Sequence, residues 1–309
     1  MAKSATRPAP TRRPSPRRGS ISERPRRVRP LALVAVAIAA GVVASQVIGS
    51  GNKPRPAVTA ASAPFVGGDL HSLVVDPTTP GRIYVGGHQG AAVSTDGGHR
   101  WRRIPSLNDA DAMGWGFADG SVWQAGHPGI HRSSNGVDFD VANAGLPSTD
   151  IHALGAGGGA IYAASPAGLL ASLDTGRTWT VRSDIGRGFM GRILVDPADR
   201  GHLVAADMAE GAAESKDGGV TWAALGGTDG AMWVTWRANE PTHLVVSGPR
   251  GAAGSDDGGK SWVTIKLPAG AMVVEADPHS DAVLYAAALR DSAAIIWRSD
   301  DAGGAWRRA

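Results

Sequence analysis

The sequence contains no cysteine, which excludes a disulfide framework, a thiolate metal site and a lipid-modified N-terminal cysteine. Aromatic residues are also scarce, at 6% of the 309 residues, and only three of them are tyrosines. Hydrophobic residues nevertheless make up 42% of the chain, which is enough to form a core. Glycine is abundant, with 43 residues, and this indicates a chain with many tight turns.

The basic charge is concentrated at the start of the chain. Residues 1–30 hold one lysine and nine arginines against the single acid Glu23, a net charge of +9. Because the formal charge of the whole sequence is +3, the other 279 residues carry a net charge of −6. A mildly acidic globular part lacks the basic surface that nucleic acids require, so no nucleic-acid partner is expected.

The first 66 residues divide into three segments. Residues 1–30, rich in Arg, Pro and Ser, are predicted to form a disordered basic tail in the cytoplasm. Residues 31–49 carry no charge, and a helix of this length rises about 28 Å, close to the thickness of the hydrocarbon core of a bilayer. Residues 50–66, which contain Pro54, Pro56 and Pro64, predict a flexible linker.

The cations ahead of residue 31 predict a cytoplasmic N-terminus, with the rest of the chain outside the cell membrane. Two interpretations of residues 31–49 stay open. An uncleaved signal anchor would give a single-pass protein attached to the membrane through this segment, whereas a cleaved signal peptide would give a secreted protein.

A repeated motif, Ser-x-Asp-x-Gly-x-x-Trp, organises the rest of the chain. Five full copies and one shortened copy follow one another at intervals of 39 to 44 residues, the usual length of a β-propeller blade. The third position of the motif is occupied by Asp96, Asn135, Asp174, Asp217, Asp257 and Asp301. The repeat predicts an all-β fold over residues 67–309, a six-bladed β-propeller with four-stranded antiparallel blades, preceded by one transmembrane or signal helix.

The residue types of the motif favour a structural role. Ser and Asp side chains accept hydrogen bonds from nearby backbone N–H groups and so shape a tight turn. Glycine adopts backbone angles that a side chain would forbid, and Trp is large enough to fill the gap between blades. The repeated Asp and Asn residues are therefore interpreted as turn formers rather than catalysts or metal ligands.

These repeats resemble the BNR or Asp-box superfamily of β-propellers, which includes sialidases, the sortilin propeller and photosystem II assembly factors. The resemblance covers about 240 residues and implies that ligands bind on the face opposite the Asp boxes. Because the superfamily contains both enzymes and binding proteins, the resemblance is specific for the fold and not for the function.

The three tyrosines argue against the sialidase reaction, in which a tyrosine paired with a glutamate is the nucleophile of the family. Tyr84, Tyr162 and Tyr285 occupy the same second-strand position of their repeats, where Val204 and Val245 stand in others. A position that also accepts valine is a packing position. No catalytic residue is assigned, and a different glycoside hydrolase, acting through two carboxylates, stays open.

Loops on the face opposite the Asp boxes carry the candidate ligand-binding side chains, since function concentrates in loops held by a rigid scaffold. These candidates are Asp69, His71, His88, Asp111, His127, His152, Arg192, Asp207, Glu210, Arg250 and Arg290. The same loops also carry Asp150 and Arg187.

Methionine recurs at the entry to the innermost strand of four repeats, as Met113, Met190, Met232 and Met272. His71 and His152 directly follow two equivalent positions. Thioether and imidazole together suit a soft metal such as copper, which predicts a metal site formed by these six residues. The alternative is a ring of apolar residues that closes the channel mouth, with methionine as a flexible filler, and no cofactor is required in that case.

Taken together, the sequence favours an extracytoplasmic binding propeller to which no catalytic activity is assigned. Its expected ligand is a glycan, a small molecule or a protein. The alternatives are an Asp-box glycoside hydrolase, which needs two converging carboxylates, and an envelope protein assembly factor, which needs an exposed apolar patch.

Overall fold

The structure is a computed structural model that describes residues 63–184 and 187–309. The segments predicted for residues 1–30 and 31–49, and most of the predicted linker, lie outside the described residues. Within the described ranges, no helix has the length and apolar character needed to cross a bilayer.

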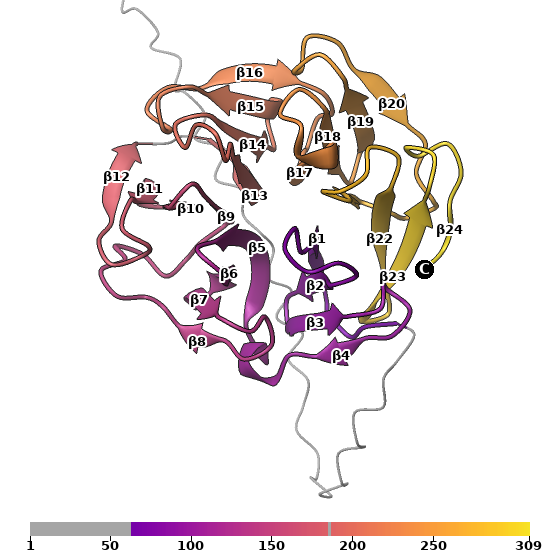
Figure 1. Cartoon of the computed structure of the whole chain (residues 1–309), viewed down its shortest axis with the longest axis horizontal. Coiled ribbons are helices and arrows are strands. Elements are labelled where there is room, and N and C mark those ends of the chain that lie inside the picture. The colour runs from indigo at the N-terminus through magenta and orange to yellow at the C-terminus, as the bar shows by residue number, and fades with distance from the viewer. Residues whose placement is uncertain (1–62, 185–186) are drawn as a thin grey trace, which may run out of the picture. The chain divides into compact units, whose positions relative to one another are not determined.

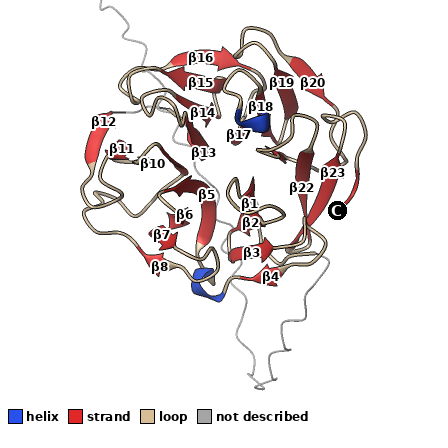
Figure 2. Ribbon diagram, viewed as in Figure 1, coloured by secondary structure: helices blue, strands red, loops and turns tan. Residues whose placement is uncertain are grey.

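The described strands form six consecutive antiparallel meanders of four strands each. The first three meanders are β1 (Leu70–Val75), β2 (Ile83–Gly87), β3 (Gly90–Ser94) and β4 (Arg102–Arg103); β5 (Asp111–Ala118), β6 (Ser121–His127), β7 (Gly129–Ser133) and β8 (Asp140–Val141); β9 (Ala153–Gly157), β10 (Ala160–Ser165), β11 (Gly168–Ser172) and β12 (Thr180–Ser183). The last three are β13 (Phe189–Val195), β14 (Leu203–Asp207), β15 (Gly211–Ser215) and β16 (Ala223–Gly226); β17 (Trp233–Trp236), β18 (Leu244–Gly248), β19 (Gly251–Ser255) and β20 (Val263–Ile265); β21 (Val273–Ala276), β22 (Leu284–Arg290), β23 (Ala293–Ser299) and β24 (Arg307–Arg308). The described part of the chain also contains two short 3-10 helices, η1 (Pro105–Leu107) and η2 (Arg237–Asn239), which lie in connections between strands (Figure 2).

The meanders are arranged as a ring, with the first strand of each at the centre and the fourth at the periphery (Figure 1). Contacts join each innermost strand to the next one around the ring: β1 to β5, β5 to β9, β9 to β13, β13 to β17, β17 to β21, and β21 back to β1. β9 and β13 also pair in parallel, so that the third and fourth meanders form one eight-stranded sheet.

The ring is closed by residues that precede β1. Phe65 forms a bridge with Ala293 of β23, and Ala294 N–H donates a 2.8 Å hydrogen bond to the carbonyl oxygen of Pro64. The start of the described chain is thereby fixed to the last meander, which protects an otherwise exposed strand edge.

Small residues allow the innermost strands to approach closely. A Cβ atom added to Gly114 or Gly116 of β5 would lie 2.7 Å from the backbone nitrogen of Leu154 or Ala156 of β9. Larger side chains fill the space between sheets farther out, where Tyr84 stacks on Trp115 with ring centroids 4.7 Å apart. The core therefore follows the ring, with backbone contacts near the axis and bulky side chains outside it.

The three tyrosines are buried, as the sequence predicted. The hydroxyl groups of Tyr84 and Tyr162 donate hydrogen bonds to the carbonyl oxygens of Gly136 and Arg200, at 3.0 and 2.9 Å. Burial raises the pKa of Tyr84, Tyr162 and Tyr285 above the ordinary tyrosine value, which opposes the formation of a phenolate nucleophile. The prediction that they are packing residues is confirmed.

The repeated motif forms the turn between the third and fourth strands of each meander. In the third meander, Ser172 Oγ accepts a 2.8 Å hydrogen bond from Gly176 N–H, and Asp174 Oδ1 accepts a 2.9 Å bond from Thr178 N–H. The same hydrogen bond, from the glycine N–H to the serine Oγ, occurs in the other five copies, including the shortened one around Asn135. These bonds are the turn-forming interactions that the sequence predicted.

Three of these turns predict a loss of stability in acid. The pKa of Asp174, Asp217 and Asp257 is lowered to about 2, from an ordinary value of 3.8. The main cause is the hydrogen bond from the side-chain hydroxyl of the residue four positions later in the chain, and the second is the hydrogen bond from the backbone N–H of that residue. Since the folded-state pKa is the lower one, the stabilisation is complete above about pH 4 and is lost as the pH falls toward 2.

We expect the melting temperature to fall between pH 4 and pH 2, and to fall less in the triple variant Asp174→Asn, Asp217→Asn, Asp257→Asn. Asn135 shows that the turn forms with asparagine. An equal fall in the parent and the triple variant would show that other carboxylates cause the acid sensitivity.

Candidate functional site

Four histidines and two aspartates lie together on the face opposite the Ser-x-Asp turns, which we call the open face. This histidine–aspartate cluster consists of His71, His88, Asp111, His127, Asp150 and His152. In an antiparallel meander the first strand begins, and the second ends, at the same face. Asp111 and His127 are therefore paired across β5 and β6, while Leu70 pairs with Gly87 and so places His71 and His88 next to each other.

The first half of the cluster is centred on Asp111. Its Oδ1 atom lies 2.9 Å from His71 Nε2, and its Oδ2 atom lies 3.3 Å from His88 Nδ1. The side chains of Asp111 and His71 are about nine-tenths buried, whereas the His88 side chain is 63% exposed. The close contact between His71 Nε2 and Asp111 Oδ1 lacks favourable hydrogen-bond geometry, and among the described residues neither ring nitrogen of His71 nor Asp111 Oδ1 has another hydrogen-bond partner.

The second half is centred on Asp150. Its Oδ1 atom contacts His127 Nε2 and lies 2.8 Å from His152 Nε2. His127 also links the two halves, because its Nδ1 atom lies 3.4 Å from Asp111 Oδ2. The imidazole rings of His127 and His152 meet edge to face, with centroids 6.0 Å apart.

Electrostatic interactions within the cluster are strong. Burial alone would lower the pKa of His71, but the Asp111 carboxylate, supported by Asp69, outweighs it, so the pKa is raised. Burial likewise opposes ionisation of Asp111, yet His71, His88 and His127 together hold its pKa below the ordinary value. Asp111 is therefore a carboxylate at neutral pH.

His202, on another part of the ring, is a useful contrast. Its Nδ1 atom is hydrogen-bonded to Asp196 Oδ2 at 3.0 Å and its Nε2 atom to Glu214 Oε1 at 2.9 Å. Each nitrogen has its own carboxylate, so this histidine is a satisfied ion-pair residue. In the cluster, by contrast, several nitrogens share one carboxylate, which is how ligands are arranged around a cation.

Three other predicted candidates have partners outside the cluster. Asp207 Oδ2 lies 3.3 Å from Arg187 Nη1, which also contacts the carboxylate of Glu210. Asp69 Oδ1 accepts a 2.8 Å hydrogen bond from Leu70 N–H and so fixes the entry to β1.

The remaining two candidates on the open face are exposed arginines. Arg250 lies 3.7 Å from Asp229, with both side chains more than two-thirds exposed. Arg290, the last residue of β22, borders a shallow pocket beside Phe65. Exposed ion pairs of this kind contribute little to stability, and neither arginine is held in a defined binding geometry.

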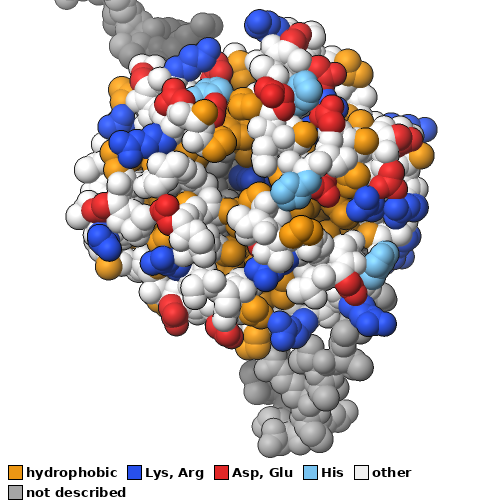
Figure 3. Space-filling model, viewed as in Figure 1, with side chains coloured by type: hydrophobic (Ala, Val, Ile, Leu, Met, Phe, Trp, Pro, Cys, Tyr) orange, Lys and Arg blue, Asp and Glu red, His pale blue; other side chains and the backbone are white. Residues whose placement is uncertain are grey.

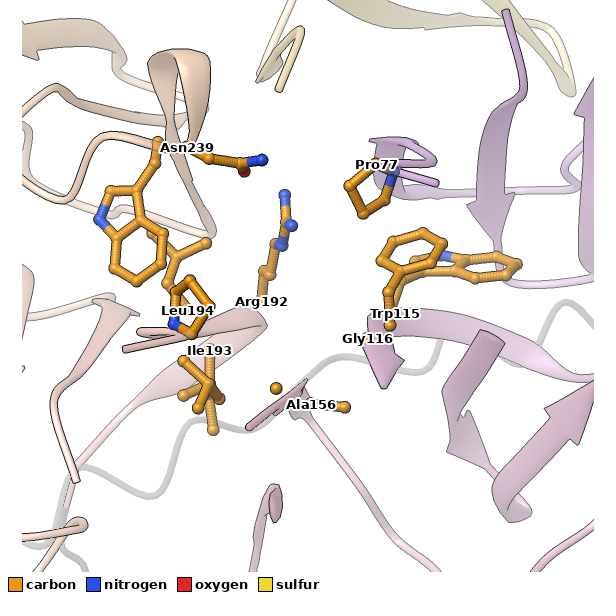
Figure 4. Close-up of a pocket in the computed structure, with 13 residues that line it drawn as sticks. Pro77, Trp115, Gly116, Ala156, Arg192, Ile193, Leu194 and Asn239 are labelled. Carbon is orange, nitrogen blue, oxygen red and sulfur yellow. The ribbon is translucent and has the colours of Figure 1, made fainter. Parts of the chain in front are cut away.

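The structure corrects the expected position of Arg192. This residue lies within β13 rather than in a loop, and its side chain points into a cavity of about 190 Å³ near the axis, bordered by Pro77, Leu194 and Asn239 (Figure 4). Arg192 Nη1 lies 2.7 Å from Oε1 of Glu275 in β21, a residue that is 1% exposed. Figure 3 shows one face of the ring hollowed at its centre, with a basic side chain visible inside.

Two important carboxylates are absent from the predicted candidates. Asp150 lies in the loops from which the candidates were drawn. Its position two residues before His152 is the sequence signal that could have identified it as part of the site. Glu275 lies in the otherwise apolar strand β21, two residues before the Asp-Pro that follows this strand. The residues two positions before the equivalent Asp-Pro after β1 and β13 are the apolar Val74 and Leu194. A charge in an innermost strand indicates a partner across the channel, but sequence alone does not say which one.

The predicted methionine and histidine site is only partly reflected in the structure. His71 and His152 belong to separate halves of the cluster, and their described ionic partners are aspartates. Met113 is buried, and Met272 packs against the hydrophobic core. Sulfur ligation by Met113, Met190, Met232 and Met272 stays a prediction.

Gly126 in β6 determines where Asp111 lies, because a Cβ atom at this position would overlap the carbonyl oxygen of Asp111. The Gly126→Ala variant is expected to lose about 1–3 kcal/mol of unfolding free energy, as overpacked sites do, since backbone must move to relieve the overlap. Gly68→Ala is the control. No atom of the described residues lies within 4 Å of its added Cβ, so a change within about 0.5 kcal/mol is expected in urea denaturation. Equal stability of both variants would contradict this account of the packing.

No protein-family model matches the chain, and its sequence matches no curated protein. Its fold is similar to that of the GH74 xyloglucanase from Xanthomonas campestris, at 19% identity and a TM-score of 0.55, over 80% of this chain and 46% of that chain. A chain of the nidogen/laminin complex is similar at 15% identity and a TM-score of 0.53, over 74% of this chain and 90% of that one. YCF48 from Cyanidioschyzon merolae gives 16% identity and a TM-score of 0.47, over 80% and 86%.

The similarities to the xyloglucanase and to the chain of the nidogen/laminin complex, together with the ring of four-stranded meanders, show that the chain is a β-propeller. The chain spans about half the length of the xyloglucanase. At such low identity the similarity establishes the fold alone, and function has to be argued from the site.

Proposed function

We propose that this β-propeller is a binding protein that holds a divalent transition-metal ion in the histidine–aspartate cluster of its open face. The observation that carries the proposal is the grouping of His71, His88 and Asp111, whose potential ligand atoms lie within 4.8 Å of one another, and in which the buried 2.9 Å ion pair of His71 and Asp111 lacks favourable hydrogen-bond geometry. Buried polar atoms are normally satisfied, and a cation between nitrogen and oxygen would satisfy both.

The donor set indicates the class of metal. Imidazole nitrogen and carboxylate oxygen suit zinc, copper(II), nickel or iron, whereas the absence of cysteine removes the ligand that most favours soft ions. Ligands bonded at 2.0–2.2 Å in a tetrahedron lie about 3.3 Å apart. Asp111 Oδ2 lies at this separation from His88 Nδ1, at 3.3 Å, whereas His71 Nε2 lies 2.9 Å from the other carboxylate oxygen, Oδ1.

The test is a zinc titration of the purified, chelator-treated chain, followed by its melting temperature. Zinc bound only to the native state should raise the melting temperature as its concentration increases, and a chelator should reverse the effect. The double variant Asp111→Asn, Asp150→Asn should abolish the shift, whereas the matched control His202→Ala should retain it. If the parent shows no shift with zinc, copper(II) or nickel, the proposal fails.

We also propose that the six meanders are the six blades of one propeller and that it works outside the cytoplasm. The closed ring of innermost strands supports the first statement, and the basic tail ahead of the uncharged residues 31–49 supports the second. A cysteine replacing Ser50 should react with a membrane-impermeant thiol reagent on intact cells, and one replacing Ser4 should not. The opposite pattern would reverse the topology.

A glycan or protein ligand at the open face, glycoside hydrolase activity and envelope protein assembly stay predictions. Glu275 has a raised pKa, chiefly from burial, as a general acid requires, but it faces Arg192 and Trp233 in the interior. No specific observation on the open face therefore favours hydrolysis over binding.

A further inference from the structure

We propose that the histidine–aspartate cluster is built for two metal ions rather than one, an inference that rests on the proposed function. The first ion is held by His71, His88 and Asp111, and the second by His127, Asp150 and His152.

Each half of the cluster has the composition of a complete site. It offers two imidazoles and one carboxylate, a set of three protein ligands that leaves a position for water or a further ligand. Within each half, the potential ligand atoms all lie within 4.8 Å of one another, a span that small side-chain adjustments around one ion can close. Each carboxylate lies at the centre of its own half, so one ion does not need ligands from both.

The two halves are coupled through His127. Its Nδ1–H can donate to Asp111 Oδ2, 3.4 Å away, and this bond leaves the lone pair of Nε2 directed at the second half. Metal-bound carboxylates and imidazoles are commonly oriented by such outer hydrogen bonds, whose loss typically costs 10–100-fold in metal affinity. His127 is thus a ligand of the second ion and a positioning residue for the first.

The degree of exposure distinguishes the two sites. The first site contains the nearly buried pair His71 and Asp111, while the second is formed by side chains that are each 33–48% exposed. Pre-organised, buried ligands lose less entropy on binding, so the first site should bind more tightly. Two binding events of different affinity are therefore expected.

The experiment is a calorimetric zinc titration of the full chain, with the zinc content after desalting as a second measure. The parent should bind two ions, one for each group of ligands. His88→Ala and His152→Ala, chosen because these side chains are more exposed than His71, should each bind one. His127→Ala should also bind one ion, but about 10–100-fold more weakly than His152→Ala does, because it loses the bond to Asp111 as well.

Two results would overturn the inference, and they differ in what else they affect. If the parent binds one ion, and His88→Ala and His152→Ala weaken it equally, a single site spans the cluster and the proposed function still stands. If the parent binds no zinc, the proposed function fails as well. Equal affinities of the remaining site in His127→Ala and His152→Ala would remove the positioning role of His127. Melting temperatures without metal, compared with those of the His202→Ala control, show whether each variant is folded.

Discussion

The Arg192→Ala variant should lose about 3–5 kcal/mol of unfolding free energy, the usual result of removing one partner from a buried ion pair. Glu275 is 1% exposed, and its Oε1 atom lies 2.7 Å from Arg192 Nη1. Its other oxygen accepts a 2.9 Å hydrogen bond from Trp233 Nε1–H. Without Arg192 the carboxylate would be buried with no counter-charge among the described residues, and β13 and β21 would lose the ion pair that joins them.

The double variant Arg192→Leu, Glu275→Gln separates the unpaired charge from the lost packing. It removes both charges but keeps an oxygen that can accept the bond from Trp233, so it should lose less than half as much as Arg192→Ala in urea denaturation. If the double variant is as unstable as the single one, the ion pair itself is not the cause.

The pH dependence of Arg192→Ala gives a second check. Burial, the largest influence, raises the pKa of Glu275 in the native state, and the Arg192 guanidinium opposes that rise. Without the guanidinium the pKa should rise further, and a carboxyl with a raised folded-state pKa loses stability as the pH increases. The deficit of Arg192→Ala should therefore be smaller at pH 4.5 than at pH 8.

The fold could be predicted because its signals are local and repeated. Each Ser-x-Asp turn is formed by side chains within a few residues of one another, so a short stretch of sequence contains the whole interaction. The burial of the tyrosines was also predictable, since Tyr84, Tyr162 and Tyr285 stand at equivalent positions of repeating units. Because the repeats are equivalent, residues at the same position of different repeats could be compared within this one sequence.

Five of the six members of the site were predicted candidates, all but Asp150, but their arrangement was not predictable. His71, His88, Asp111, His127 and His152 were candidates because propeller topology assigns them to one face. Which of them meet depends on distances around the ring, and these follow from strand register and bulges, such as the shift between Ala112 and Gly114 in β5. Hence His71 and His152, expected in one site, lie in different halves of the cluster.

Arg192 shows the opposite failure. Expected in a loop of the open face, Arg192 instead lies within β13, and its side chain, 17% exposed, points into the channel, because the sequence alone did not define where this inner strand begins. Its partner Glu275 is 83 residues away in the sequence. A contact between repeats that are not neighbours leaves no periodic signal, so it required the structure.

The Trp101→Ala variant is expected to lose about 3–5 kcal/mol of unfolding free energy, the usual cost of truncating a buried large aromatic side chain. Trp101 follows the first Ser-x-Asp turn and is 2% exposed, and its Nε1–H donates a 2.7 Å hydrogen bond to the carbonyl oxygen of Gly98. Trp179, which is only partly buried at the same point of the third repeat, should cost less when replaced by alanine.

Trp101→Phe is the matched control, because Phe139 occupies the equivalent position in the shortened repeat and is itself buried. Phenylalanine keeps most of the apolar contact and loses the hydrogen bond to Gly98, which contributes about 0.5–1.5 kcal/mol. Chemical denaturation should therefore rank the variants as parent, Trp101→Phe and Trp101→Ala in order of falling stability. A loss below about 1 kcal/mol for Trp101→Ala would mean that the turn can close without its aromatic side chain, and that the ring of blades depends on its innermost strands instead.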